Sequence, residues 1–343
     1  MGAHLHDEPE LDGDTPVLEI VGLTVDLPTQ AGPVRVLDGV NLSIGRGEIV
    51  GVAGESGSGK SMTAMSVLGL LPPRARLNGS IRFAGEELTQ LSAAAMRAIR
   101  GRRIGMVFQD PMTTLNPLMR VGEQIAEAYA IHHPREGRRR AKQRALDMLG
   151  LVGVPDTAAR AEQYPHQWSG GMRQRAVIAM ALVNDPELLI ADESTTALDA
   201  TIQAQVLDVL TRARAELGIS VLFITHDLGL IAQIAGRTIV MYAGRVMETA
   251  STEAVFANSH HPYTRALMAS RPGATPPGAR LPTIPGRPPA PGSVGDGCPF
   301  APRCSFPLKD ERCRSERPPL RSSADGRLSA CHFRNQYAEG TFQ

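Results

Sequence analysis

The chain has 343 residues, of which 42% are apolar, and its 36 basic and 35 acidic residues leave a net charge of +1. This composition excludes a disordered chain, and the balanced charge provides no global field that would attract nucleic acid or an acidic membrane. No stretch of about 18 residues is apolar and free of charge, and residues 1–16 lack the basic and apolar regions of a secretory signal. We therefore expect a large α/β domain with an accessory module, without a membrane span or a leader.

The first predicted elements are strands at residues 18–27 and 34–44, where apolar side chains alternate. We expect them to pair in a small antiparallel sheet. The apolar run at 48–53 predicts a buried strand, followed by a glycine-rich loop and a helix over 60–71 that Pro72-Pro73 ends. Further short apolar strands are predicted at 104–108, 188–191, 220–225 and 238–242. Their alternation with helical stretches predicts a parallel sheet covered by helices.

Changes in composition along the chain indicate several segments. Residues 272–291 contain eight prolines, which favours an extended connector over a packed element. All four cysteines lie beyond this connector, so the C-terminal part differs chemically from the rest. We expect a flexible tail at 1–16, a main domain at 17–271 with a helical subdomain at about 112–182, a proline-rich linker at 272–292, a cysteine-rich extension at 293–335 and a tail at 336–343.

Residues 54–61, GESGSGKS, fit the phosphate-loop pattern G-x-x-x-x-G-K-[ST] at the required place, after a strand and before a helix. In this pattern backbone N–H groups surround the phosphates, the lysine reaches the β and γ phosphates, and the last hydroxyl ligates Mg²⁺. A chance glycine-rich turn is the alternative. The predicted ATP-binding residues are Gly54, Glu55, Ser56, Gly57, Ser58, Gly59, Lys60, Ser61 and Met62. Lys60 is also one of only three lysines in the chain, with Lys142 and Lys309.

The predicted strand at 188–191 ends in two carboxylates, Asp192 and Glu193. At the carboxyl end of a parallel strand, these side chains are expected beside the phosphate loop. Asp192 would then hold Mg²⁺, and Glu193 would orient and deprotonate the attacking water. A pair of helix-capping acids is the alternative reading of the same residues.

Residues 168–175, WSGGMRQR, resemble the signature motif of the ABC ATPases, which in that family binds the γ-phosphate of the nucleotide held by the partner cassette. Gln109 is similar to the Q-loop glutamine of the family, residues 197–199 to its D-loop, and His226 to its switch histidine. The resemblance implies a P-loop NTPase (RecA-like) ABC cassette with an antiparallel β-subdomain and an α-helical subdomain. It implies catalytic roles for Glu193, His226 and Gln109, Mg²⁺ ligands Ser61, Gln109 and Asp192, the D-loop residue Asp199, and a signature of Ser169, Gly170, Gly171 and Met172.

A narrower resemblance is to the oligopeptide/dipeptide (peptide/nickel) importer ATPases. It rests on FQDPMTTLNP at 108–117, YPH at 164–166 and HPYT at 261–264. The chain also lacks an aromatic residue before Phe83, whereas the family's adenine-stacking aromatic would lie near Leu27.

This narrower resemblance implies an ATPase subunit that powers import of di- or oligopeptides from the cytoplasmic face of the inner membrane. The implied partners are two transmembrane permease subunits, a second related ATPase subunit and a solute-binding protein, with no nucleic acid. Two alternatives stay open: an importer of nickel or another small solute, and a soluble ABC ATPase that acts on the ribosome or DNA.

The cysteines follow the spacing C-x5-C-x8-C-x17-C in a proline-rich segment that is too short to fold on apolar burial alone. Two disulfides, reduced thiols, Zn²⁺ or an iron–sulfur cluster are the possible states, and loose spacing without C-x2-C pairs favours the cluster over zinc. The segment also resembles the C-terminal extension of the importer ATPases. That likeness implies a [4Fe-4S] cluster held by Cys298, Cys304, Cys313 and Cys331, with Zn²⁺ as the alternative.

Overall fold

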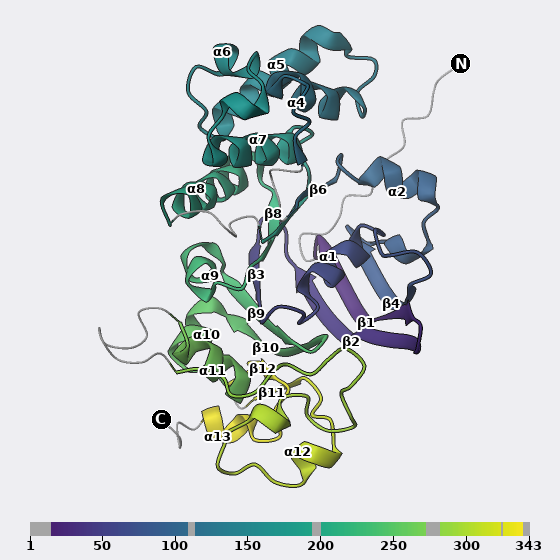
Figure 1. The fold of residues 1–343 in the computed structure, drawn as a ribbon, viewed down its shortest axis with the longest axis vertical. Coiled ribbons are helices and arrows are strands. Elements are labelled where there is room, and N and C mark those ends of the chain that lie inside the picture. The colour runs from purple at the N-terminus through teal and green to yellow at the C-terminus, as the bar shows by residue number, and fades with distance from the viewer. Residues whose placement is uncertain (1–14, 109–113, 194–199, 272–281, 324, 339–343) are drawn as a thin grey trace.

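The computed structural model describes residues 15–108, 114–193, 200–271, 282–323 and 325–338. Residues 1–14 of the predicted tail, and residues 272–281 of the predicted linker, lie outside this part of the chain. The described residues form two β-sheets with helices around them, and the N-terminal strands pair as the sequence predicts (Figure 1).

The first sheet is antiparallel and has the order β2-β1-β4-β5. Its strands are β1 (Leu18–Thr29), β2 (Gly32–Ile44), β4 (Arg76–Phe83) and β5 (Glu86–Glu87). Alternate side chains of β1 are buried against the neighbouring sheet, which explains why the apolar period of two residues was visible in the sequence.

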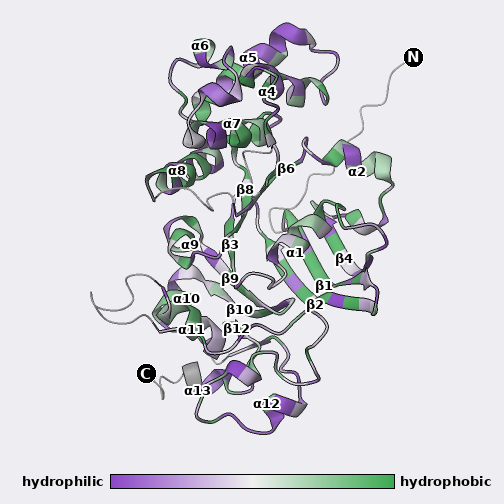
Figure 2. Ribbon diagram, viewed as in Figure 1, coloured by the Kyte–Doolittle hydropathy of each residue, from purple (hydrophilic) through white to green (hydrophobic). Residues whose placement is uncertain are grey.

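The central sheet has the order β11-β12-β10-β9-β3-β8-β7-β6. Strands β9, β3, β8, β7 and β6 are parallel, as predicted, whereas β10, β12 and β11 continue the sheet in antiparallel pairing. The strands are β3 (Ile49–Ala53), β6 (Ile104–Val107), β7 (Leu188–Asp192), β8 (Ser220–Ile224), β9 (Arg237–Tyr242), β10 (Arg245–Ser251), β11 (Arg321–Ser322) and β12 (Leu328–Ser329). The inner strands are fully buried and strongly hydrophobic (Figure 2).

Helices cover this sheet and extend beyond its β6 end (Figure 1). The described helices of the chain are α1 (Lys60–Val67), α2 (Ala93–Ile99), α4 (Val121–Ala130), α5 (Gly137–Leu151), α6 (Thr157–Ala161), α7 (Gly170–Leu182), α8 (Ala200–Leu217), α9 (Leu228–Ile234), α10 (Thr252–Ala257), α11 (Pro262–Ala269), α12 (Arg312–Ser315) and α13 (Arg334–Ala338). Helices α4 to α7 pack together within one hydrophobic cluster. Among the described helices, none combines the length and apolarity that a bilayer crossing needs.

Helix α1 is shorter than predicted. It ends at Val67, whereas the predicted end is residue 71. Gly69 has a φ of +59°, a left-handed conformation that ends the helix before the two prolines are reached.

The C-terminal extension packs against the central sheet at the end opposite α4 to α7 (Figure 1). Its strand β12 pairs with β10 through Glu248 opposite Ser329 and Thr249 opposite Leu328. Phe300 of the extension shares a hydrophobic cluster with residues of β9, β10 and α11. The extension is therefore joined to the sheet by both strand pairing and apolar packing, neither of which is predictable from the sequence motifs.

Glu248, on β10, has a side chain that is completely enclosed at the start of α11. Its carboxylate accepts backbone N–H groups of His260 at 2.6 Å and His261 at 3.1 Å. Burial raises the pKa of Glu248 from 4.5 to about 7, more than these hydrogen bonds lower it. Between pH 4.5 and 7 the folded chain thus retains a proton that the unfolded chain has lost.

We expect the stabilising contribution of Glu248 to be fully present below pH 4.5 and to be lost as the pH rises to 7. Urea unfolding of wild type and Glu248→Gln across this range measures it, because Gln stays neutral throughout. The difference in unfolding free energy, wild type minus variant, should fall with rising pH. His261, whose pKa burial lowers to about 3, contributes in the opposite direction but equally in both proteins. If the difference in unfolding free energy between wild type and Glu248→Gln does not change with pH, the raised pKa of Glu248 is contradicted.

Candidate ATP-binding site

The glycine-rich loop connects the end of β3 with the start of α1 and requires glycine at two positions. At Gly54 an added Cβ would lie 2.2 Å from the carbonyl oxygen of Met241. Gly59, the N-cap of α1, has a φ of +104°, and a Cβ there would lie 2.7 Å from a methyl group of Leu37. Larger residues would force this backbone away from its neighbours, so the glycines allow the loop to close tightly at the helix N-terminus.

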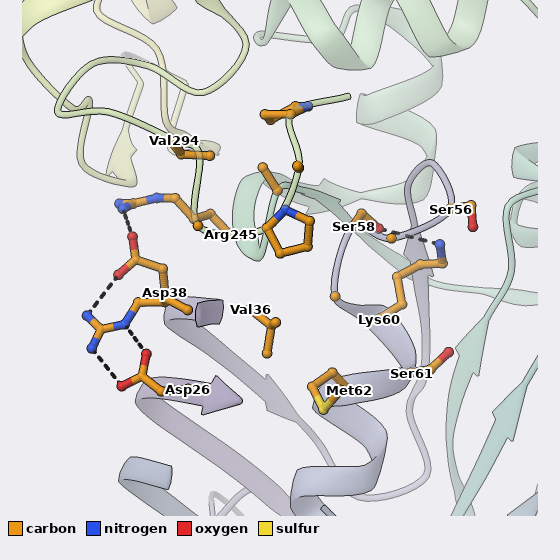
Figure 3. Close-up of a pocket in the computed structure, with 18 of the residues that line it drawn as sticks. Asp26, Val36, Asp38, Ser56, Ser58, Lys60, Ser61, Met62, Arg245 and Val294 are labelled. Atoms are coloured by element: carbon orange, nitrogen blue, oxygen red, sulfur yellow. Dashed lines mark hydrogen bonds and ion pairs between the residues drawn. The ribbon is translucent and has the colours of Figure 1, made fainter. Parts of the chain in front are cut away.

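Lys60 points into the loop that precedes it and is only 4% exposed. Its ammonium donates to the carbonyl oxygens of Gly54 at 2.8 Å and Glu55 at 3.1 Å. Burial lowers the pKa of Lys60, and the carboxylates of Glu193, Asp192 and Glu55 oppose that shift. The cation is thus enclosed by the loop at the place where phosphates would enter (Figure 3).

Ser61 and Asp192 meet at the carboxyl ends of the parallel strands. The Ser61 hydroxyl donates to Oδ1 of Asp192 at 3.0 Å. Burial raises the pKa of Asp192, although the bond from Ser61 and the charge of Lys60 counteract the effect. A hydroxyl and a carboxylate side by side suit the oxygen coordination of Mg²⁺. Gln109, the third predicted ligand, lies outside the described residues.

Glu193, the next residue, has a φ of +46°, which is uncommon for a residue with a side chain. Its backbone N–H donates to Ile224 at 2.8 Å, so the pairing with β8 holds this conformation. Its Oε1 lies 3.7 Å from Nδ1 of His226, which follows β8. Two of the three predicted catalytic side chains, Glu193 and His226, are therefore brought together. Strained backbone of this kind is often found at functional sites.

A cavity of about 730 Å³ lies beside the loop, within the range typical of small-molecule sites. Ser56, Ser58, Lys60 and Ser61 line one side, and the side chains around Asp26, Asp38 and Arg245 line the other (Figure 3). Its apolar lining includes Val36, Met62, Pro289, Pro291 and Val294. No aromatic residue is among the described lining residues, in line with the missing aromatic near Leu27. The contribution of residues 289–294 was missed, because a proline-rich connector carries no signal for the surface it touches.

Ion pairs hold the far wall of this cavity together. Asp38 accepts from Arg245 at 2.9 Å and from Arg317 of the extension at 2.5 Å. Arg35 donates to Asp26 at 2.8 Å, and this bond lowers the pKa of the Asp26 carboxyl. The cavity is thus enclosed jointly by the first sheet, β10 and the extension.

The predicted signature residues lie elsewhere, at the start of α7. Ser169 is its N-cap and accepts the N–H of Met172 at 3.3 Å. Ser169 and Gly170 are exposed, whereas a Cβ on Gly171 would lie 2.9 Å from Ile202. None of these residues lines the cavity at the phosphate loop. Asp199, the predicted D-loop residue, lies outside the described part of the chain.

The four cysteines line one cavity of about 20 Å³ in the extension, together with Phe300, Phe306 and Phe333. None of them forms a disulfide, and no group of three or more His, Cys, Asp or Glu side chains within the described residues has a metal-binding arrangement. The expected cluster or zinc site is therefore not seen. The thiols are of the right kind, but the cavity has room for about one water molecule, so a cluster would require this shell to widen.

Burial governs the chemistry of these thiols. It raises the pKa of Cys298 to about 11 and that of Cys331 to about 12, and it also raises the pKa of Cys304. Neutral thiols are poor nucleophiles and poor metal ligands, so thiolates would form here only with a compensating positive charge such as a bound metal.

A phosphate loop at the end of a central parallel strand, with an acidic pair on a neighbouring strand, defines this chain as a P-loop nucleotide-binding protein. Comparison with family models refines that class. Residues 37–196 match the ABC transporter family, and residues 247–313 match the oligopeptide/dipeptide transporter C-terminal region. The chain belongs to the ABC transporter ATP-binding proteins, in the oligopeptide/dipeptide branch that the sequence motifs indicated.

The named relatives support this family assignment. The oligopeptide transport ATP-binding protein OppD of Mycobacterium tuberculosis is 48% identical over 92% of this chain, which spans only about half (52%) of that relative's length. A putative peptide import ATP-binding protein of Brucella abortus is 47% identical, with 92% of this chain and 94% of the relative covered. The dipeptide transport ATP-binding protein DppD of Bacillus subtilis is 45% identical, with 94% and 96% covered.

Solved structures show the same fold. The ATP-binding cassette MJ0796, in a dimeric post-hydrolysis state bound to ADP and Pi, superimposes with a TM-score of 0.61 at 28% identity, covering 68% of this chain and 98% of that one. The protein cbiO1 of Clostridium perfringens, described as part of the ABC transporter complex cbiONQ, gives a TM-score of 0.60 at 27% identity, covering 71% of this chain and 91% of that one. The predicted ABC cassette fold is confirmed.

Proposed function

We propose that this chain is the ATP-hydrolysing subunit of an importer of di- or oligopeptides. The observation that carries the proposal is the convergence of Lys60, the Ser61–Asp192 pair and the Glu193–His226 pair at one loop. The match of residues 247–313 to the oligopeptide/dipeptide region supports peptide as the cargo. The alternatives of nickel import and of ribosome or DNA action have no support among these relatives.

In this proposal residues 54–62 bind the triphosphate, and the backbone N–H groups of the loop surround its anionic oxygens. Ser61, Asp192 and Gln109 would hold Mg²⁺, which neutralises charge on the β and γ phosphates. The Glu193 carboxylate takes a proton from the attacking water, and His226 lies close enough to orient this carboxylate. The exposed Ser169 and Gly170, with Gly171 and Met172, bind the γ-phosphate of a nucleotide held by a second cassette, and Asp199 lies at that junction.

The proposed partners follow from this division of the site. A signature that lies away from its own phosphate loop requires a second ATPase subunit, and we favour a related but different chain over a second copy. Two permease subunits would provide the membrane path, with the chain peripheral on the cytoplasmic face and a solute-binding protein delivering the peptide. We propose residues 17–271 as the cassette, including a helical subdomain at about 112–182, followed by the linker 272–292 and the extension 293–335.

For the extension we propose a structural metal centre held by Cys298, Cys304, Cys313 and Cys331, a [4Fe-4S] cluster in preference to Zn²⁺. The position of all four cysteines in the lining of one cavity, together with aromatic rings, supports it. Bound metal would supply the positive charge that buried thiolates need. No redox role is part of this proposal.

The test of the function is purification of the chain from its native membranes under anaerobic conditions, with the co-purifying proteins identified. We expect two multi-span permeases and a second ATPase, and peptide-stimulated ATP hydrolysis after reconstitution with the matching binding protein. Recovery of ribosomes or nucleic acid without permeases would contradict the transport function. Stimulation by nickel or another small solute, with none by peptides, would contradict the cargo.

The metal centre is tested on the same sample by measuring iron, acid-labile sulfide and zinc. About four iron and four sulfide per chain are expected for a cubane cluster. One zinc per chain would show that the cysteines bind zinc and not a cluster. If iron, sulfide and zinc are all absent, the cysteines are thiols and the proposed metal centre is wrong.

A further inference from the structure

The extension reaches the phosphate loop through Arg303. Its two terminal nitrogens donate to the two carboxylate oxygens of Glu55 at 2.6 and 2.9 Å. Its Nε donates to the carbonyl oxygen of Pro285 at 2.8 Å, and Nη1 lies 3.2 Å from the hydroxyl of Tyr242. Arg303 is 7% exposed. A two-pronged, charge-assisted pair in such an enclosed place is among the stronger polar contacts in proteins.

Glu55 is the second residue of the phosphate loop, and its backbone organises the loop. Its carbonyl oxygen accepts from the Lys60 ammonium at 3.1 Å and from the N–H of Ser58 at 3.1 Å. Its own N–H donates to the hydroxyl of Tyr263 on α11 at 2.9 Å. The position of Glu55 therefore determines the position of the lysine that reaches the phosphates.

Arg303 is itself held by a turn of the extension. Its N–H donates to Phe300 at 3.0 Å in the short 3-10 helix η3 (Ala301–Arg303), which lies between Cys298 and Cys304. The Phe300 ring packs against Tyr242 at 5.5 Å and against Tyr263 at 5.3 Å between ring centres. The Phe300 ring thus supports both contacts to Glu55. The Arg303 guanidinium binds the Glu55 carboxylate, and the Tyr263 hydroxyl accepts the Glu55 backbone N–H.

The charge of this pair matters as much as its geometry. A carboxylate in the phosphate loop lies next to the place where the triphosphate binds, and without a partner it would repel the anion. Arg303 neutralises that carboxylate and fixes its position through its own bonds to the Tyr242 hydroxyl and the Pro285 carbonyl oxygen. Both effects favour nucleotide binding.

We propose that Arg303 is a positioning residue of the ATP site, which sets the phosphate loop and neutralises Glu55, so that the fold of the extension controls ATP affinity. The proposal rests on the function proposed above, since it takes residues 54–62 as the ATP-binding loop. Under this proposal the extension contributes a residue, Arg303, to the nucleotide site.

Arg327 provides a matched control, because it also fastens the extension to the cassette but away from the loop. It donates to the carbonyl oxygens of Ala254 at 2.8 Å and Asn258 at 2.6 Å, and it pairs with Asp325 at 2.8 Å. A loss of ATP affinity caused only by loosening of the extension should therefore follow from Arg327→Met as well as from Arg303→Met.

The experiment measures the dissociation constant of MgATP for the purified full-length chain by calorimetry. Arg303→Met is expected to weaken binding about tenfold, within the range common for coupling between sites. The double variant Arg303→Met/Glu55→Gln should recover most of that loss, because no unpaired carboxylate then remains. Arg327→Met should bind within about twofold of wild type, since it leaves the charge near the phosphates unchanged.

Equal affinity of Arg303→Met and wild type would overturn the inference, and so would a double variant as weak as Arg303→Met. If circular dichroism shows that Arg303→Met does not fold, Arg303→Gln with and without Glu55→Gln gives the same comparison, because Gln also removes the charge that neutralises Glu55. A wild-type chain that binds no ATP would overturn the proposed function and this inference with it. Binding by wild type without any change in the Arg303 variants overturns the inference alone.

Discussion

Glu193→Gln is expected to lower ATP turnover by about 10²- to 10⁴-fold, the usual contribution of a general base. The amide keeps the shape of the side chain but cannot take a proton from water. ATP should stay bound and hold two cassettes together, because the loop, Lys60 and the Ser61–Asp192 pair are unchanged. Phosphate release measures turnover, and gel filtration with MgATP measures the closed dimer.

Glu187→Gln is the matched control for this variant. Glu187 precedes the same strand at its opposite end, away from the loop, where its half-buried side chain pairs with Arg103 at 2.6 Å. The control should retain turnover close to that of wild type. Turnover at the wild-type rate in Glu193→Gln would remove Glu193 from its proposed role, whatever the control does.

Lys60→Met is expected to reduce ATP turnover by about 10²-fold or more, as removal of one charge-stabilising group typically does. Met retains much of the apolar stem that fills the buried space, so the variant removes mainly the ammonium. Without it, the loop carbonyls of Gly54 and Glu55 lose the bond from the ammonium, and the γ-phosphate loses its cation. Phosphate release and the affinity for MgATP measure the effect together.

Lys142→Met is the natural control, because the chain has only three lysines. Lys142 is 66% exposed, and its nitrogen lies 3.7 Å from Glu162, a surface pair of the kind that contributes little. We expect it to leave turnover unchanged. An unchanged turnover in Lys60→Met would show that ATP is not hydrolysed at this loop.

Much of the fold was predictable because it depends on local periodicity. Alternation in β1 and β2, and the mainly apolar runs of β3, β7 and β8, match the burial that the structure shows. The meeting of Ser61 with Asp192 was predictable as well, since the carboxyl ends of parallel strands share one edge of the sheet. The roles of these residues remain predictions.

The contacts of the extension could not be predicted. Strands β11 and β12 have two residues each, too few for any alternation to be recognised. Arg303 and Glu55 are 248 positions apart, and neither lies in a local pattern that points to the other. Nor does the sequence reveal that residues 289–294 face the cavity, because a connector is recognised by its composition alone. Contacts of this kind depend on how the finished domains pack.

The pairing of β12 with β10 has a consequence for solubility. Without the extension, β10 would be the edge of the central sheet and would expose a row of unpaired backbone groups, which promote association between chains. With the extension present, β11 is the edge strand on this side of the sheet. It has two residues and carries the charged Arg321. Short, charged edge strands are the usual protection against aggregation. The extension thus shields the sheet from self-association, whatever its cysteines bind.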